Sequence, residues 1–320
     1  MPDVEQRFLP FARLMAATGV ATVLVLNDKG LEPALRFAAV AAALGSTLFL
    51  FPTWLKAPGT LRESLARLWH YRMLILLWLK YNVLSRYSQT VLGILWIMLL
   101  PLATSAILAL VFSQFLRMQL TDTPFISFFL TALVPWSLFS QGIFGSTTAI
   151  LAHMTLINQV PFPREVLVIR TLSESLMDAV FMFLCLLLIN ALVGVYPQDK
   201  MLFLPVIVFI QACGMLGLMF FISAFSVFVR DVPQLVSVLM QLLFYLTPIL
   251  YPVDFVPSEF RVLLDINPLS FLIQSYRDII LDNTLPDATS LYTALVGALL
   301  LLFAGYTFFK AHEHRLADYV

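Results

Sequence analysis

NQVPFPREVLVIRTLSESLMDAVFMFLCLLLINALVGV, residues 158–195, joins a short polar connector with two prolines to an apolar run over residues 166–195. A helix needs about 20 apolar residues to cross a bilayer. Hydrocarbon offers the backbone no hydrogen-bond partner, so a spanning run must be a helix or part of a closed barrel, and this unbroken run favours the helix. The stretch therefore predicts a membrane helix that begins just after a proline-rich connector.

The composition of the whole chain also indicates a membrane protein. Of its 320 residues, 60% are hydrophobic and 12% are charged, and the mean hydropathy is +0.90. A soluble domain cannot keep this much apolar surface in water. The formal net charge of zero says nothing by itself about partners; we expect membrane lipids among them and no nucleic acid.

Eight apolar runs have lengths near that of a membrane span. They cover residues 10–26, 34–55, 91–116, 124–146, 166–195, 201–229, 234–252 and 289–309. The first run is short, carries Arg13 near its start and has no Ala-x-Ala pattern before Asn27. A span or an interfacial helix is therefore favoured there over a cleaved signal peptide. Together the runs predict an all-α, polytopic transmembrane protein.

The positive charges predict the orientation of these spans. With the N-terminus in the cytoplasm, 13 of the 19 Lys and Arg residues fall on or near the inner side. Those residues are Arg7, Arg13, Lys56, Arg62, Arg67, Arg72, Lys80, Arg86, Arg164, Arg170, Arg230, Lys310 and Arg315. The outer side receives Lys29, Arg36, Arg117, Lys200, Arg261 and Arg277. The positive-inside rule therefore places both termini and the 158–165 connector in the cytoplasm.

Motifs of an ATPase or a hydrolase are absent from the sequence. It has no G-x-x-x-x-G-K-[ST], G-x-S-x-G or H-E-x-x-H pattern and no Asp-rich metal cluster. Cys185 and Cys213 fall inside predicted spans without metal spacing, so we interpret them as packing residues. Catalysis within this chain is not expected, and energy for transport must come from a partner protein or an ion gradient.

Residues 61–90 follow Pro58 and Gly59 and have the period of an amphipathic helix. Leu61, Leu65, Leu68 and Trp69 share one arc of the helical wheel, opposite Arg62, Glu63, Arg67 and His70. The basic face suits anionic headgroups, which favours a helix lying in the plane of the membrane. The apolar patch 73–79 is too short to span. Anchoring and a role in substrate access both remain open.

The connector predicts a stiff projection. A short helix over its lead-in, ended by the restrictions before Pro161 and Pro163, would place Phe162 at the tip with Arg164 and Glu165 beside it. A rigid partner protein could move such a projection by pressing on it. The alternative is an ordinary inside loop.

Residues 248–290 are too long for a turn and too polar to cross. Pro248 and Pro252 interrupt the seventh run, and Leu269 to Leu281 have helical spacing, with Pro268 after Asn267 as a helix start. A pair of short helices dipping into the outer leaflet fits this pattern better than a plain external loop.

Charges inside the fifth run have helical spacing. Arg170, Glu174 and Asp178 stand at i, i+4 and i+8, and such charges face protein or a cavity. The simplest interpretation is an ion pair between Arg170 and Glu174. Alternatively, Glu174 and Asp178 line a conduit or relay protons.

Several short motifs occur in an order that resembles the permease of ABC-2 type exporters, in the branch that exports lipid-linked polysaccharides such as O-antigen, teichoic acid and capsule. RYSQTVLGILWIMLLP at 86–101 is similar to the family's R-Y-x-x-T-x-L-G-x-L-W start of the first core span, and LVPWSLF at 133–139 is similar to the next span. The family's N-x-x-x-F-P-R-E connector matches Asn158, Phe162, Pro163, Arg164 and Glu165. Arg230 with Asp231 resembles its second inside turn, and LTPILYP at 246–252 with Asn267 and Pro268 resembles its external gate region.

The resemblance implies a six-span permease domain over 57–320, preceded by a 1–56 extension of one or two spans that carries no family motif. It implies a bacterial inner-membrane homodimer that works with two copies of a separate ATP-hydrolysing subunit. ATP and Mg²⁺ belong to that subunit, and no cofactor is expected in this chain. Asn158, the residues from Phe162 to Glu165, Arg230 and Asp231 would couple to the ATPase. The gate helix would carry Arg62, Arg67, Trp69 and Arg72.

A lipid-linked glycan would then move between two copies of the chain, along a path lined by aromatic rings. We assign Trp96, Phe139, Phe244, Tyr245 and Tyr251 to this path, and Asn267, Pro268 and Arg277 to the external gate. Export of another lipid or amphipathic small molecule is one alternative, and an ion-coupled secondary transporter is a second. A membrane-embedded glycosyl or acyl transferase could use Asp254, Glu259 and Asp265, but nothing in the sequence organises them.

Overall fold

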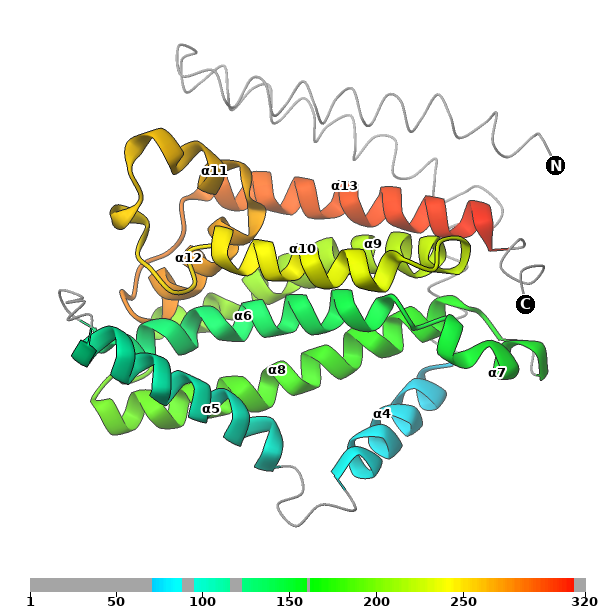
Figure 1. The fold of residues 1–320 in the computed structure, drawn as a ribbon, viewed down its shortest axis with the longest axis horizontal. Helices are drawn as coiled ribbons and strands as arrows, with labels where there is room; N and C mark the ends of the chain where they lie inside the picture. Colours follow the sequence, from blue (N-terminus) through cyan, green and yellow to red (C-terminus); the bar gives the residue numbers. More distant parts are fainter. Residues whose placement is uncertain (1–70, 88–94, 116–122, 160–161, 314–320) are drawn as a thin grey trace.

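The computed structural model describes residues 71–87, 95–115, 123–159 and 162–313, and every regular element within these ranges is helical (Figure 1). In chain order they are α4 Arg72–Tyr87, α5 Leu95–Leu110, the π-helical turn η1 Val111–Phe115, α6 Phe125–Ser146, η2 Leu151–His153, α7 Met154–Gln159, α8 Glu165–Val193, η3 Asp199–Phe203, α9 Leu204–Phe228, α10 Val232–Leu246, η4 Val253–Phe255, η5 Ser258–Phe260, α11 Arg261–Ile266, α12 Pro268–Ile280 and α13 Ala288–His312. The all-α prediction is confirmed. The 1–56 extension, with its runs at 10–26 and 34–55, lies outside the described residues.

Within the described residues, four helical segments are long and apolar enough to cross a membrane: Phe125–Ser146, Glu165–Val193, Asp199–Phe228 and Ala288–His312. Two shorter apolar helices are Pro101–Phe115 and Val232–Leu246. Each predicted run from residue 91 onward overlaps one of these segments.

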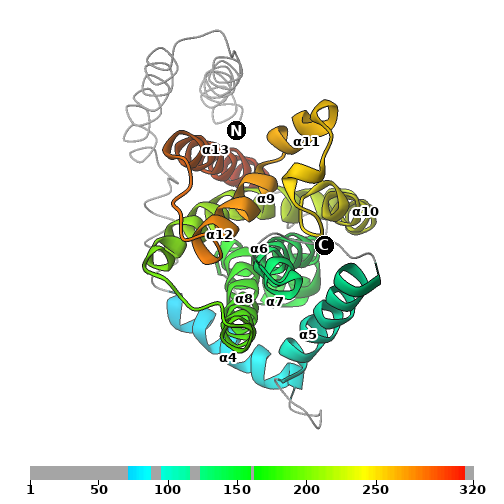
Figure 2. The ribbon, with the colours of Figure 1, turned by 90° about the vertical axis from the view of Figure 1, so that its left-hand side faces the viewer.

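The long helices lie side by side, and the two ends of the bundle differ (Figures 1 and 2). One end holds α7 and the last turn of α13; we call it the connector end. The other holds α11 and α12; we call it the opposite end. Helices α4 and α5 lie at an angle along one side of the bundle.

The ends of α8 and α10 follow from backbone restrictions. After α8, Gly194 has φ 90°, a left-handed conformation that favours glycine. The seventh apolar run extends to residue 252, but α10 ends at Leu246, because Thr247 precedes Pro248 and takes an extended conformation with ψ 139°. The interruption predicted at the prolines is thus confirmed, and it shortens the helix.

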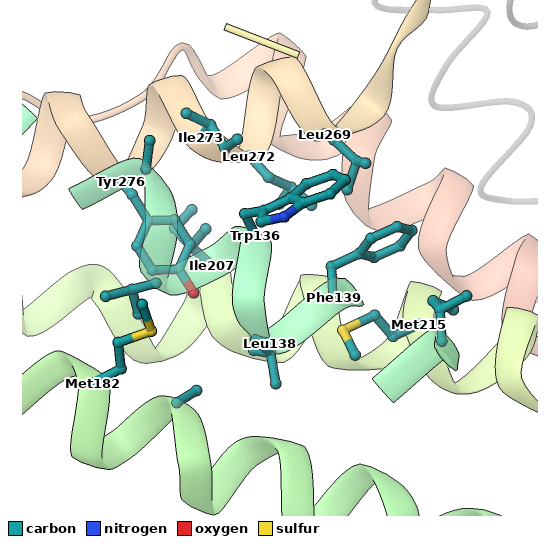
Figure 3. Packing of buried hydrophobic residues seen from close by; sticks show 14 of the residues in the cluster. Trp136, Leu138, Phe139, Met182, Ile207, Met215, Leu269, Leu272, Ile273 and Tyr276 are labelled. Atoms are coloured by element: carbon teal, nitrogen blue, oxygen red, sulfur yellow. The ribbon is translucent and has the colours of Figure 1, made fainter. Parts of the chain in front are cut away.

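α6 is the central helix, packed against α5, α8, α9, α10 and α12. Figure 3 shows Trp136, Leu138 and Phe139 of α6 among side chains of the three neighbours α8, α9 and α12. Those neighbours contribute Met182, Ile207, Met215, Leu269, Leu272, Ile273 and Tyr276. Lipid is as apolar as these side chains, so close packing rather than escape from water must hold the helices together.

Helices α9 and α13 approach so closely that their backbones touch. A Cβ atom on Gly217 would overlap the backbone of Leu301, and one on Gly305 would overlap the Gly217 carbonyl group. Small residues allow this approach in membrane bundles, where dispersion contacts supply much of the association energy.

Candidate functional site

The connector between α6 and α8 forms a short helix, as the sequence predicts. η2 and α7 follow the end of α6, and α7, which contains Asn158, ends at Gln159 before Pro161. The first amides of α8 donate to the carbonyl oxygens of Pro163 and Arg164, both at 3.1 Å. The proline motif therefore sets the start of α8.

Phe162 packs inward instead of forming the exposed tip that the sequence predicted. Its side chain is half-buried, and its ring meets the indole of Trp78 on α4 edge to face, with 6.1 Å between the centroids and 84° between the planes. Aromatic pairs prefer this geometry because a positive ring edge faces a negative ring face. The connector thus contacts α4 directly.

Trp78 is the centre of a wider group, which we call the Trp78 cluster: Trp78, His153, Phe162, Arg170 and Glu174. The guanidinium carbon of Arg170 lies 5.2 Å from the Trp78 ring centroid, and the His153 ring centroid lies 6.2 Å from it. Arg170 Nε donates to Glu174 Oε1 at 2.7 Å, so the predicted ion pair is confirmed. The cluster links α4, η2, the connector and α8.

The hydrogen bonds of His153 identify its neutral form. Its Nδ1 lies 3.0 Å from the Ala149 carbonyl oxygen, to which it donates. Its Nε2 then accepts from Arg170 Nη1 at 2.5 Å. Burial lowers the pKa of His153 below its usual value of 6.5, and the positive charge of Arg170 also lowers it. A proton on Nε2 would break the bond to Arg170.

A second group of charges ties the connector to α13. Glu165, the first residue of α8, is fully buried and pairs with Nζ of Lys310. Lys310 also pairs with Glu313 at 2.7 Å, and Arg164 Nη1 donates to the Glu313 carbonyl oxygen. A buried carboxylate needs such a partner, and its place at a helix N-terminus stabilises it further.

The other predicted coupling residues lie at the same end of the bundle. Arg230 and Asp231 are exposed in the turn between α9 and α10. The ribbon places this turn and α7 at the connector end (Figure 1). The segments that carry the residues predicted to couple to an ATPase therefore lie at one end of the bundle (Figure 1).

Only part of the predicted gate helix falls within the described residues. Arg72 is exposed at the first position of α4, whereas Arg62, Arg67 and Trp69 lie outside the described ranges. Trp78 and Lys310 were not predicted as site residues. Trp78 is the one aromatic residue in the apolar patch 73–79, but nothing in the sequence pairs Lys310 with Glu165.

At the opposite end, two hydrogen bonds fasten α12 to the break after α10. Asn267 Nδ2 donates to Thr247 Oγ1 at 2.9 Å, and Arg277 Nη2 donates to the Ile249 carbonyl oxygen at 3.0 Å. Asn267 also caps α12 by accepting from the Leu269 amide, so the start predicted at Pro268 is confirmed. The buried Arg277 guanidinium stacks 3.5 Å from the centroid of the Phe128 ring.

The five aromatic residues assigned to a substrate path occupy different environments. Phe139 is buried in the core, and Phe244 is half-buried with its ring 5.5 Å from that of Trp136. Trp96 and Tyr245 are exposed. Tyr251 is half-buried and donates to the Tyr245 carbonyl oxygen at 3.0 Å. Among the described residues, no group of three His, Cys, Asp or Glu side chains could hold a metal ion.

Comparison with known proteins gives a family match. Residues 73–281 match the model of the ABC-2 type transporter family. The O-antigen export system permease protein RfbA of Myxococcus xanthus is 30% identical over 253 residues, which cover 78% of this chain and 96% of that protein.

Two further relatives have similar coverage. The RfbA protein of Klebsiella pneumoniae is 30% identical over 238 residues, which cover 73% of this chain and 89% of that protein. The polysialic acid transport protein KpsM of Escherichia coli is 25% identical over 240 residues, which cover 73% and 92%.

Proposed function

The chain belongs to the ABC-2 type transporter family, and on that premise we propose that it is the membrane-spanning subunit of a polysaccharide ABC exporter. The named relatives are permeases for O-antigen and polysialic acid. As a permease subunit, the chain does not hydrolyse ATP, and a separate ATP-binding subunit supplies the energy. Its cargo is a lipid-linked glycan, moved outward across the bacterial inner membrane.

One observation carries the coupling role: the connector is fastened to two other parts of the bundle. Phe162 contacts Trp78 of α4, and Glu165 pairs with Lys310 of α13. A partner that closes on ATP can do mechanical work only through stiff contacts. Arg230 and Asp231, with Asn158 and the half-buried residues Phe162 to Arg164, therefore form the docking surface for that partner, and the buried Glu165 fixes this segment to α13.

The remaining assignments follow from this docking surface. The connector end faces the cytoplasm, with both termini on that side. Arg62, Arg67, Trp69 and Arg72 act as the gate at the lipid surface, where the arginine side chains suit anionic headgroups. Two copies of the chain and two copies of the ATPase form the exporter, with Asn267, Pro268 and Arg277 at the outer gate.

The double variant Phe162→Ala/Arg164→Ala tests the docking role. Expressed with the ATP-binding subunit in cells lacking the native permease, it should insert normally but fail to export glycan or to co-purify with its partner. Trp78→Ala is the matched control for co-purification: it removes the internal contact of Phe162 but leaves the docking surface intact, so the ATP-binding subunit should still co-purify. Normal export by the double variant would refute the docking role.

A further inference from the structure

The exposed surface of α10 has two chemically different edges. Leu235, Leu239 and Leu242 lie along one edge, each more than half exposed at 57%, 53% and 61%. The other edge carries Gln234, Ser237, Gln241 and Tyr245, all exposed. Steps of three and four residues keep these side chains on one face of a helix. We call this second set the α10 polar stripe.

The exposed surfaces of the long helices α8 and α9 carry no such stripe. On α8 the large exposed residues are Val180, Leu184, Leu188 and Leu192, and on α9 they are Val206, Phe209, Phe221 and Phe225. Acyl chains can cover these apolar surfaces without leaving a hydrogen-bonding group unsatisfied. Acyl chains offer no hydrogen bonds to the amides of Gln234 and Gln241. Polar side chains within a bilayer therefore face protein or a water-filled path.

The polar stripe lies beside the central helix α6. Phe244 adjoins the stripe, and its ring packs edge to face on Trp136 of α6. One turn further along α6, the half-buried Ser140 adds a hydroxyl group on the same side. Viewed from the end of the bundle, α10 and α5 lie on the same side of α6 (Figure 2), and α6 packs against both. The stripe thus borders a face of the bundle that these three helices form.

We propose that the α10 polar stripe lines the path of the glycan and hydrogen-bonds to its hydroxyl groups. This inference rests on the proposed function and adds the residues that contact the cargo. A Gln side chain both donates and accepts hydrogen bonds, and so does a sugar hydroxyl group. Gln234 and Gln241 can therefore bind a hydroxyl group as its donor or as its acceptor. The stripe from Gln234 to Tyr245 extends about 16 Å along the helix at 1.5 Å per residue. A glycan moving along the stripe can therefore exchange one hydrogen-bonding side chain for the next without losing all its hydrogen bonds.

Cysteine labelling in native membranes tests the inference. The chain has two cysteines, Cys185 and Cys213, so a double Ala variant provides the background. Ser237→Cys and Gln241→Cys probe the stripe, and Leu239→Cys and Leu184→Cys are matched controls on apolar exposed surfaces. The probe is a membrane-impermeant maleimide applied to inside-out vesicles that also contain the ATP-binding subunit.

The thiolate is the reactive form, and apolar surroundings suppress it. We therefore expect Ser237→Cys and Gln241→Cys to react about tenfold faster than either control, and lipid-linked glycan to slow the reaction at both positions. Equal rates at all four positions would contradict the inference. So would spontaneous disulfide formation between two Ser237→Cys copies, which would place the stripe in a tight contact between subunits.

A functional variant provides an independent measurement. Gln234→Leu/Gln241→Leu keeps helix propensity and replaces the two amides with apolar side chains, so the protein should insert, yet glycan export should fall about tenfold. Leu235→Met/Leu242→Met is the matched control and should export normally. Full export by the Leu variant would overturn the inference. Export by the wild-type chain separates the two hypotheses: a wild-type chain that moves no glycan with its ATP-binding subunit refutes the proposed function itself.

Discussion

Trp78 of α4 and Phe162 of the connector meet edge to face, with 6.1 Å between their ring centroids. The same indole lies 5.2 Å from the guanidinium carbon of Arg170 on α8. The surface that a partner would push is therefore in contact with both the lateral helix α4 and the first turns of a spanning helix. Movement of the connector cannot leave α4 in place without breaking this contact.

Replacing Trp78 with Ala should separate ATP hydrolysis from export. The variant loses an aromatic pair and a cation–π contact, together about 2 kcal/mol, while the docking surface is unchanged. Export should fall roughly tenfold or more, and the ATP-binding subunit should still co-purify. Trp78→Phe should retain most of the activity, and Tyr81→Ala, which removes an exposed ring from the same helix, should have no effect. Unimpaired export by Trp78→Ala would exclude transmission through this contact.

Removing Lys310 should destabilise the protein more than removing both charges. Lys310→Met leaves the buried Glu165 carboxylate without this ion pair, a loss of about 3 kcal/mol. Adding Glu165→Gln removes the charge and should restore most of that stability. Thermal unfolding in detergent measures both variants, and additive losses in the double variant would show that the two residues do not interact.

The glycine contact between α9 and α13 predicts a contrast between two substitutions on one helix. Gly305→Ala introduces a methyl group that overlaps the Gly217 carbonyl group, so overpacking should cost about 1–3 kcal/mol. A Cβ on Gly297 would meet no atom of the described residues within 4 Å. Gly297→Ala should therefore be neutral or stabilising by up to about 1 kcal/mol. Equal melting temperatures of the two variants would contradict this packing.

His153 predicts a loss of stability on acidification. Its pKa in the folded protein is below 6.5, so between that pKa and 6.5 the unfolded chain binds more protons. The free energy of unfolding should therefore fall as the pH drops through this window and level off below it. His153→Gln keeps a hydrogen-bonding side chain that does not titrate. Unfolding temperatures at about pH 7.5 and pH 5.5 should differ less for this variant than for the wild type, and equal differences would refute the assignment.

Local signals predicted much of the fold. Apolar runs marked the spanning helices, Pro248 marked the break after α10, and Asn267 with Pro268 marked the start of α12. The pair of Arg170 and Glu174 followed from helical spacing alone. Each of these predictions depends on residues close together in the sequence, where backbone geometry fixes the outcome.

Contacts between distant residues could not be predicted in this way. Lys310 reaches Glu165 only because α13 ends beside the start of α8, and Trp78 reaches Phe162 only because α4 lies along the bundle. The inward position of Phe162 has the same origin: its sequence neighbours predicted a projection, but α4 supplies a ring for it to pack against. Phe139 likewise lies in the core because α6 is surrounded by other helices.

Reconstitution in sealed vesicles tests the central claim most directly. The purified chain, with and without its ATP-binding subunit, is supplied with lipid-linked glycan, and movement of the glycan across the membrane is measured with ATP or with an ion gradient. We predict movement only when the second subunit and ATP are both present. Glycan transport by this chain alone, driven by an ion gradient, would contradict the account.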